Sequence, residues 1–519
     1  MNRNQSIQQI QDTFQWDIII IGGGATGLGC AVDAASRGYK TLLLEKYDFA
    51  KGTSSRATKL VHGGVRYLAQ GNIRLVREAL LERGRLLKNA PHVCHTMAFV
   101  VPFYKWWQKW YYGVGLWLYE LLSGKLSLGK TKLLSKKGTL RNLPDLSADK
   151  LMGGVLYFDG QFDDSRLAIN LAQTATEQGA TVINYVGVTG FIKDEGKIKE
   201  VLAKDGCSGN NYQIKGKVII NATGVFADEL LQLAEGHNKQ TIAPSQGIHL
   251  VVDKHFFKGI AGMMVPKTDD GRVLFAIPWH DKLLLGTTDT PVENIVTEPT
   301  ALKEEIDFII HHFNRYASAA IQYRDVLSVF VGLRPLAKTG KEKKTAVMPR
   351  DHHIAVLPSG LIHVTGGKWT TYRSMAQHAV DKALQSAGLK WVDCKTKNLP
   401  LHGWVPANET SHFSIYGSDA ASIKKMMQEN VLLSEKIHTQ YPYTKAEVKW
   451  MIENEMAITV EDMLARRIRL LFLDAKAAME AAPVVAAMIA KELNKGQEWI
   501  NDQVDTFIKL ATGYLIPQP

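Results

Sequence analysis

The feature that most constrains this chain lies near its N-terminus, where three glycines stand between an apolar run and a run of small residues. The run 17–21 (Asp-Ile-Ile-Ile-Ile) is apolar and β-branched, which predicts a buried parallel strand. Gly22, Gly24 and Gly27 follow, and the small residues from Cys30 onward predict a helix. The spacing G-x-G-x-x-G between a strand and a helix predicts a dinucleotide-binding turn.

Each position in this pattern has a physical role. Gly22 permits the tight turn, Gly24 lets the backbone approach a pyrophosphate, and Gly27 lets the helix pack against the strand. The helix N-terminus offers free N–H groups and the positive end of the helix dipole to the phosphates. A second apolar run ends in Glu45, whose carboxylate is placed to accept hydrogen bonds from the adenosine ribose hydroxyls.

Two apolar runs far downstream decide between NAD and FAD. Residues 218–224 end in Ala-Thr-Gly, and residues 361–367 lead directly into a helix that begins near Lys368. A nicotinamide dehydrogenase usually completes its site from one contiguous domain, whereas here the nucleotide domain is assembled from three distant segments. That layout is typical of FAD enzymes in which the last strand–helix junction lies against the isoalloxazine. We therefore expect FAD as the cofactor.

The order of these segments predicts an α/β protein with three parts. They are a glutathione-reductase-like (Rossmann-type) FAD-binding domain, an inserted antiparallel-sheet substrate domain and a C-terminal all-α domain. The expected boundaries are 15–95, 150–240 and 350–390 for the discontinuous FAD-binding domain, 96–149 and 241–349 for the substrate or cap domain, and 395–519 for the helical domain.

Local patterns refine two of these parts. The apolar runs 273–277 and 282–286 predict a β-hairpin in the substrate domain. In the C-terminal part, a capping pattern at Thr459 predicts a helix that continues through Leu471. A further helix is expected from Ala475 to Asn494, with Asp474 as a cap and a kink at Pro483.

Composition and charge exclude several classes of protein. The 519 residues include 62 Lys and Arg against 51 Asp and Glu, a net charge of +11. The four cysteines are scattered without metal-ligand spacing, so no metal centre is expected and a reducing compartment is favoured. The first sixteen residues lack the apolar core of a signal peptide, and no apolar run is long enough to span a bilayer. A cytoplasmic location is expected, in solution or on the cytosolic face of a membrane.

Three runs carry a resemblance to a known family: Gly52 to Leu68 (GTSSRATKLVHGGVRYL), Val331 to Leu336 (VGLRPL) and Gly366 to Arg373 (GGKWTTYR). The chain resembles the FAD-dependent, membrane-associated (aerobic-type) glycerol-3-phosphate dehydrogenases from about residue 15 into the C-terminal helices. One local departure is Arg56, where the family has a small residue.

The resemblance implies a flavoenzyme that oxidises sn-glycerol 3-phosphate to dihydroxyacetone phosphate by hydride transfer to FAD and passes the electrons to membrane quinone. Two alternatives are a glycerol-3-phosphate oxidase that reduces O2 and another amine or hydroxy-acid oxidase of the same fold. A basic nucleic-acid module is not favoured, because no nucleic-acid-binding motif is found. A homodimer is compatible with the resemblance.

The resemblance and the dinucleotide motif together give the expected cofactor contacts. The Thr-Ser-Ser segment after Gly52 offers hydroxyls to the pyrophosphate, and by resemblance His62 lies against the flavin. The residues expected to contact FAD are Gly22, Gly24, Ala25, Thr26, Gly27, Glu45, Thr53, Ser54, Ser55, Lys59, His62, Gly63, Gly64, Ala222, Gly224, Gly366, Gly367, Lys368 and Thr370.

Arginines next to prolines suit a rigid phosphate site. Arg334 precedes Pro335, and Arg350 follows Pro349. A stiff neighbourhood favours a planar fork aimed at phosphate. The expected substrate-binding residues are Arg66, Tyr67, Arg334 and Arg350.

A base near pKa 7 is needed to take the hydroxyl proton. We expect His249 as this base, with Lys368 as an electrostatic partner and Arg334 completing the catalytic set. Lys368 is the rival base, because a lysine in a partly desolvated pocket can lose its proton.

Charge and aromatic residues gather in one segment. Residues 101–150 carry a net charge of +6, and residues 104–119 hold four of the eleven tryptophans. Trp and Tyr favour the headgroup layer of a bilayer, and basic side chains favour an anionic leaflet. We expect residues 104–137 to contact an anionic membrane surface; the alternative is an aromatic core helix followed by a lysine-rich loop.

Overall fold

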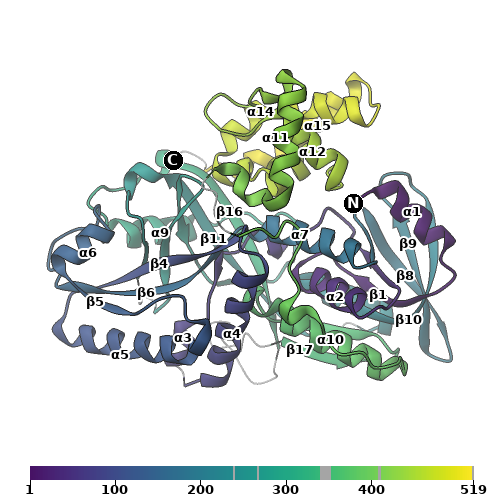
Figure 1. Ribbon diagram of the computed structural model, residues 1–519, viewed down its shortest axis with the longest axis horizontal. Helices are drawn as coiled ribbons and strands as arrows, with labels where there is room; N and C mark the ends of the chain where they lie inside the picture. The colour runs from purple at the N-terminus through teal and green to yellow at the C-terminus, as the bar shows by residue number, and fades with distance from the viewer. Residues whose placement is uncertain are drawn as a thin grey trace.

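The computed structural model describes residues 1–69, 71–237, 240–265, 268–269, 271–338, 352–406 and 411–516. Two β-sheets lie side by side, and the C-terminal helices lie over their junction (Figure 1). The chain is therefore a mixed α/β protein with a helical C-terminal region, as the sequence predicts.

The first sheet brings together the three distant apolar runs. Its main path is β17 (His352–Val356), β18 (Ile362–Gly366), β10 (Asn211–Asn221), β1 (Trp16–Ile21), β2 (Thr41–Leu44) and β7 (Thr181–Ile183). All neighbours are parallel except β17 and β18. In β1, Ile18 and Ile20 face one core and Ile19 and Ile21 face another, because both faces of the sheet are covered.

Helices cover one face of this sheet and a three-stranded antiparallel layer covers the other (Figure 1). The helices are α2 (Ala25–Ser36), α7 (Asp164–Glu177) and α10 (Tyr372–Ala387). The antiparallel layer consists of β8 (Val186–Asp194), β9 (Lys197–Asp205) and the first half of β10. α1 (Arg3–Asp12) and α8 (Ala227–Glu235) flank this unit.

The second sheet is mainly antiparallel. Its order is β15 (Thr290–Pro291), β11 (Ile242–Asp253), β14 (Lys282–Gly286), β13 (Leu274–Trp279), β12 (Gly262–Val265), β4 (Cys94–Phe103), β6 (Gly153–Phe162) and β3 (Leu60–Val61), with β16 (Val326–Ala337) paired to β11 and β5 (Lys132–Ser135) to β6. The predicted hairpin is confirmed as β13 and β14, with His280 and Asp281 in the left-handed region at its turn. β3 and β6 pair within this sheet although they fall in ranges expected for the FAD-binding domain.

Helices flank the second sheet. They are α3 (Val65–Ala69), α4 (Ile73–Asn89), α5 (Trp106–Ser123), α6 (Lys136–Asn142) and α9 (Lys303–Asn314). α5 is the helix expected from residues 104–119, and it runs along the outer edge of the molecule, far from the C-terminal helices (Figure 1).

The C-terminal region contains α11 (Ala420–Glu429), α12 (Lys445–Asn454), α13 (Leu470–Leu473), α14 (Ala475–Glu492) and α15 (Gln497–Thr512). Asp474 caps α14 by accepting a hydrogen bond from the Ala477 backbone N–H at 3.1 Å, as predicted. The predicted helix start at Thr459 is confirmed, because the Asp462 N–H donates to Thr459 Oγ1 at 3.1 Å. The helix does not continue unbroken to Leu471, however. A π-helical turn, Asp462–Arg467, is followed by Arg469 in the left-handed region, because the arginines here turn toward the first sheet.

Candidate active site

The glycine turn between β1 and α2 has the geometry that the sequence requires. Gly22 has φ +112°, and a Cβ there would lie 2.6 Å from the Ala222 carbonyl oxygen. A Cβ on Gly27 would lie 1.9 Å from the Gly22 carbonyl oxygen, so only glycine lets the helix approach the strand. The turn therefore presents the N-terminus of α2 to the cavity beside it.

This cavity has a volume of about 540 Å³ and crosses the carboxyl ends of β1, β2, β10 and β18. Ligands of open α/β sheets bind at this end of the strands. The expected cofactor residues that line it are Gly22, Gly24, Ala25, Thr26, Glu45, Thr53, Ser54, Ala222, Gly224, Gly366, Gly367 and Lys368. The residues present thus fit an extended dinucleotide with its pyrophosphate at α2.

Glu45 lies at the end of β2, where the sequence places it. Its carboxylate accepts hydrogen bonds from the backbone N–H of Gly23 at 2.5 Å and of Tyr47 at 2.8 Å. Burial raises the pKa of Glu45, and these two hydrogen bonds oppose the shift. The carboxylate therefore fixes the glycine turn as well as lining the cavity.

The Thr-Ser-Ser segment forms a short 3₁₀ helix, η1 (Thr53–Ser55), beside the N-terminus of α2. Ser54 Oγ accepts a hydrogen bond from the Ala25 N–H at 2.9 Å, and the Thr53 hydroxyl donates to the Leu333 carbonyl at 2.6 Å. The Ser54 carbonyl accepts from the Trp369 indole N–H at 2.9 Å. Ser55 turns away from the cavity, and its carbonyl accepts a hydrogen bond from the Lys59 ammonium at 2.8 Å.

The last strand–helix junction closes the other end of this cavity. Gly367 has φ +86°, and the turn leads into η7 (Trp369–Thr371), the 3₁₀ helix before α10. Thr370 lies behind the wall: its hydroxyl accepts from the His62 N–H at 3.2 Å and donates to the His62 carbonyl at 3.3 Å. Gly63 also lies behind the wall, because a Cβ there would meet Leu80 at 2.6 Å. Both residues therefore support the loop that carries His62.

A smaller cavity of about 130 Å³ lies between this loop and the second sheet. The expected site residues His62, Gly64, Tyr67 and Arg334 line it. The Lys368 ammonium, which lines the larger cavity, lies 4.6 Å from the centre of the Tyr67 ring. The two cavities therefore adjoin at the Lys368–Tyr67 contact.

Arg334 is held firmly in the smaller cavity. One terminal nitrogen donates to the Thr288 carbonyl at 2.9 Å and to Thr287 Oγ1 at 3.1 Å, and the other lies 3.4 Å from a carboxylate oxygen of Asp289. These contacts fix the plane of the guanidinium before any substrate binds.

His249 lies behind the wall of the smaller cavity, with 2% of its surface exposed. Its Nε2 lies 2.9 Å from the hydroxyl of Thr58, which lines the cavity, and its ring stacks on Phe330 at 4.9 Å between centroids. Burial holds the pKa of His249 well below its ordinary value, and the positive charges of Lys59 and Arg334 add to this shift. The neutral imidazole of His249 is thus connected to the smaller cavity by one hydrogen bond, to the Thr58 hydroxyl.

Lys59 lies outside both cavities. Its ammonium is fully buried and pairs with a carboxylate oxygen of Asp164 at 2.7 Å, within 5.0 Å of the centre of the Phe330 ring. Burial lowers the pKa of Lys59 to about 7, and the charge of Arg469 lowers it further against the pull of Asp164. The Lys59 ammonium therefore supports the loop that carries His62 and does not line the larger cavity.

Two expected substrate residues cannot be placed. Arg66 belongs to α3, but its side chain lies outside the described part of the structure, and Arg350 lies outside the described residues altogether. Among the described residues, no group of three or more His, Cys, Asp or Glu side chains is arranged to hold a metal ion.

Several lining residues were not expected from the sequence. In the smaller cavity these are Thr58, Asp159, Met264, Arg272, Thr287, Thr288 and Asp289. In the larger cavity, Lys51 and Trp369 were also missed. Thr58, Lys51 and Trp369 lie within or next to the runs that carry the resemblance, so their closeness to these runs could have identified them as lining residues. No sequence pattern near Arg272 predicts that it lines a cavity.

The chain matches two sequence profiles: FAD dependent oxidoreductase over residues 17–381, and the C-terminal domain of alpha-glycerophosphate oxidase over residues 362–499. It is 38% identical to the mitochondrial glycerol-3-phosphate dehydrogenase of Homo sapiens, over 99% of this chain and 76% of that protein. The Arabidopsis thaliana mitochondrial glycerol-3-phosphate dehydrogenase is 37% identical, over 92% of this chain and 82% of that protein. A crystal structure of glycerol-3-phosphate dehydrogenase from Bacillus halodurans complexed with FAD superposes with a TM-score of 0.81 at 28% identity, covering 99% of this chain and 98% of that one.

The fold, the cofactor cavity and the first profile make this chain an FAD-dependent oxidoreductase. FAD is therefore its cofactor, as the sequence predicts. Within that class, the identity over almost the whole chain makes it a member of the glycerol-3-phosphate dehydrogenase family.

Proposed function

We propose that the protein oxidises sn-glycerol 3-phosphate to dihydroxyacetone phosphate. The observation that carries this proposal is the small cavity that adjoins the cofactor cavity and is lined by Arg272 and Arg334. Two guanidinium groups suit a dianionic phosphate, and a volume of about 130 Å³ suits a three-carbon substrate better than a large one.

Phosphate binding is assigned to the arginines. Arg334 is oriented by the Thr287 hydroxyl and the Thr288 carbonyl, so it needs little reorganisation when the anion enters. Tyr67 lies beside Lys368 at the opening between the cavities and would orient the glycerol part. Arg66 and Arg350 complete the proposed phosphate site on the sequence argument alone.

The proposed base is His249, which receives the proton of the substrate hydroxyl through Thr58. The hydroxyl proton of the substrate passes to Thr58 Oγ1 while the Thr58 proton passes to His249 Nε2. Thr58 therefore keeps one proton, and the proton that the substrate oxygen loses is carried by the imidazole. FAD, when bound, supplies the two-electron acceptor for the C2 hydride. Lys368, at the junction of the cavities, favours the negative charge that develops on the substrate oxygen.

Anaerobic titration of the purified holoprotein tests the substrate. Glycerol 3-phosphate is expected to bleach the visible flavin absorbance, while glycerol and an amino acid leave it unchanged, because only the first carries the phosphate. Bleaching by the amino acid and not by the phosphate would place the protein among the amine oxidases and overturn the proposal.

We further propose that the electrons pass to a membrane quinone and that α5 contacts the bilayer. Trp106 is 70% exposed, Trp107 45%, Trp110 54% and Tyr111 61%, so these aromatic rings do not form a core helix. The lysines of the segment are Lys105, Lys109, Lys125, Lys130, Lys132, Lys136 and Lys137. Such rings favour the headgroup layer, and the lysines favour anionic lipid. Within the described ranges, no helix is both long and apolar enough to cross a membrane.

Vesicle sedimentation tests the membrane contact. The protein is expected to pellet with anionic phospholipid vesicles at low salt and to be partly released at high salt. Changing Trp106, Trp107 and Trp110 to Ser should abolish pelleting and leave the flavin content unchanged, whereas Trp391→Ser, a change at another exposed tryptophan, should have no effect. Pelleting by the triple variant would refute the anchor.

The acceptor is tested separately from the membrane contact. Turnover with a quinone analogue is expected to exceed turnover in air, with little hydrogen peroxide formed. A stoichiometric peroxide yield in air would instead identify the oxidase activity.

A further inference from the structure

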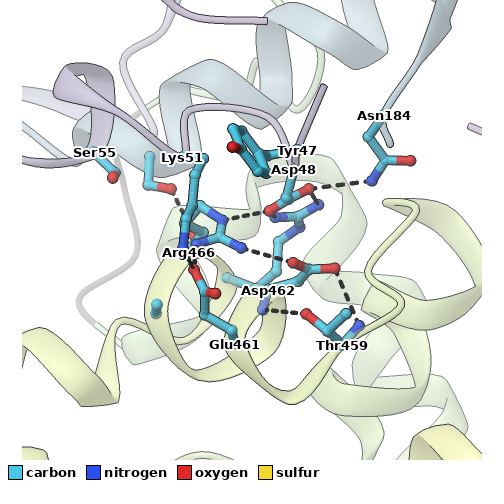
Figure 2. A network of polar contacts seen from close by, with 12 residues as sticks. Tyr47, Asp48, Lys51, Ser55, Asn184, Thr459, Glu461, Asp462 and Arg466 are labelled. Carbon is cyan, nitrogen blue, oxygen red and sulfur yellow. Dashed lines mark hydrogen bonds and ion pairs between the residues drawn. The ribbon is translucent and has the colours of Figure 1, made fainter. Parts of the chain in front are cut away.

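The interrupted helix of the C-terminal region carries an unusual set of buried arginines. Arg466 is 3% exposed, Arg467 0% and Arg469 1%. A buried guanidinium is costly unless every charge is paired. All three side chains reach the loop that follows β2, which spans residues 48–56 and is called here the cofactor loop. Figure 2 shows Arg466 pointing toward Asp48 of this loop.

Asp48 begins the cofactor loop and receives two of these arginines. Its Oδ2 lies 2.5 Å from Arg466 Nε, a contact drawn in Figure 2, and 2.7 Å from an Arg467 terminal nitrogen. The Asn184 amide donates to the other carboxylate oxygen at 3.3 Å. Burial raises the pKa of Asp48, but Arg467 and Arg466 outweigh it and hold the value at about 2. Asp48 is therefore charged and forms ion pairs with two arginines of the C-terminal region.

Lys51 makes the second connection. Its ammonium pairs with Glu461 (Figure 2). It also lies 2.7 Å from a carboxylate oxygen of Glu298. Glu461 also pairs with Arg466, so the two connections share one network. Lys51 itself lines the cofactor cavity.

Ser55 makes the third connection, through its backbone. Its carbonyl accepts a hydrogen bond from Arg469 NH2 at 2.8 Å, and the same nitrogen lies 3.1 Å from a carboxylate oxygen of Asp164. This contact explains why Ser55 turns away from the cavity.

The connections therefore flank the cofactor contacts along the loop. Asp48 and Ser55 hold the C-terminal region on either side of the cavity-lining run, residues 50–54, and Lys51 does both. The bond from the Ala25 N–H to Ser54 Oγ then ties the loop to the N-terminus of α2, the expected pyrophosphate site. The loop is held between the cofactor cavity and the C-terminal helices.

We propose that residues 461–469, called here the C-terminal clamp, position the cofactor loop for FAD, so that FAD binding and docking of the C-terminal helices stabilise each other. The clamp residues do not contact the cofactor; they act through Asp48, Lys51 and Ser55. Thermodynamic linkage requires the coupling to be reciprocal. The free energy by which the docked clamp strengthens FAD binding therefore equals the free energy by which bound FAD stabilises the docked clamp. The proposal rests on the FAD cavity and not on the identity of the substrate.

The test compares FAD affinity among full-length variants. Glu461→Gln removes the charge that pairs with both Lys51 and Arg466, and FAD is expected to bind the apoprotein about tenfold more weakly. Glu461→Asp restores the charge and should recover part of the affinity. The matched control is Glu492→Gln, which removes the 2.9 Å pair with Lys449 elsewhere in the C-terminal region. The dissociation constant is measured by quenching of protein fluorescence during FAD titration.

A second measurement separates positioning from a merely structural role. Hydrogen exchange of the wild-type apoprotein and holoprotein should show slower exchange over residues 461–469 when FAD is bound. A Glu461→Gln protein with a lower melting temperature and unchanged FAD affinity would overturn the proposal. If that variant does not fold, equal exchange of the clamp with and without FAD in the wild type would overturn it. Neither result depends on oxidation of glycerol 3-phosphate.

Discussion

Replacing Thr58 by Val tests the proposed route of the substrate proton. Valine has nearly the same shape as threonine but cannot bond to His249, whose Nε2 lies 2.9 Å from the Thr58 hydroxyl. His249 is 2% exposed, so water does not readily replace the lost partner. The substitution therefore removes one hydrogen bond and leaves the fold of the loop unchanged.

The size of the effect follows from the burial of the imidazole. An unsatisfied buried polar group costs about 1–3 kcal/mol. The imidazole must accept a proton during the reaction, so the loss of its partner raises the free energy of the transition state more than that of the resting enzyme. At about 1.4 kcal/mol for each factor of ten, flavin reduction should slow by about 5- to 150-fold.

Stopped-flow mixing with glycerol 3-phosphate under anaerobic conditions measures this rate. Thr58→Ser keeps the hydroxyl and should recover most of the wild-type rate, and both variants should retain FAD because Thr58 does not line the cofactor cavity. A rate for Thr58→Val within twofold of the wild type would refute the route and assign the base to Lys368 or to water.

Three further perturbations check the substrate site, the proposed base and an ion pair outside the site. Arg334→Lys keeps the charge and loses the planar fork, so KM for glycerol 3-phosphate in steady-state assays should rise about 10- to 100-fold with full FAD content, and an unchanged KM would remove Arg334 from the substrate site. His249→Ala should slow flavin reduction and flatten the acidic limb of the pH profile of this rate. That limb is expected well below pH 6.5, because burial lowers the pKa of His249. If the variant keeps the limb, another group is responsible for it. For His402, burial lowers the pKa, but Asp419 and Glu177 outweigh it and raise the value to about 9. Its folded value thus exceeds the unfolded value of about 6.5, so its stabilisation is complete below that pH and is lost as the pH rises through 9. His402→Gln should accordingly lower the melting temperature more at pH 6 than at pH 10, and equal shifts would contradict this.

The cofactor site could be predicted to a large extent because its signals are local. Gly22 needs its positive φ for the turn and Gly27 needs space beside the Gly22 carbonyl, and both requirements arise within the turn itself. The same is true of Glu45, which ends a strand, and of Asp474, which caps a helix. Each of these residues was found from spacing alone.

The smaller cavity was predicted less well because its walls come from distant strands. Arg272 precedes β13, and no pattern around it distinguishes it from a surface arginine. The position of Lys59 could not be predicted either, because its partner Asp164 is more than a hundred residues away. The predicted helix does not run unbroken to Leu471 for a related reason. Helical periodicity contains no information about Asp48 and Ser55, which pair with the arginines where the helix becomes π-helical and then breaks at Arg469.

The parallel order β18, β10, β1 and β2 also sets when during synthesis the protein can acquire its cofactor. Residues 18–21 of β1 pair with residues 218–221 of β10, which in turn pairs with residues 362–363 of β18. A nascent chain that has not yet reached Trp369 lacks one wall of the cavity, however completely its first βαβ unit has folded. The complete cavity therefore cannot form before these residues have been synthesised, and a chain released after 350 residues would leave the edge of β10 that pairs with β18 without its neighbour.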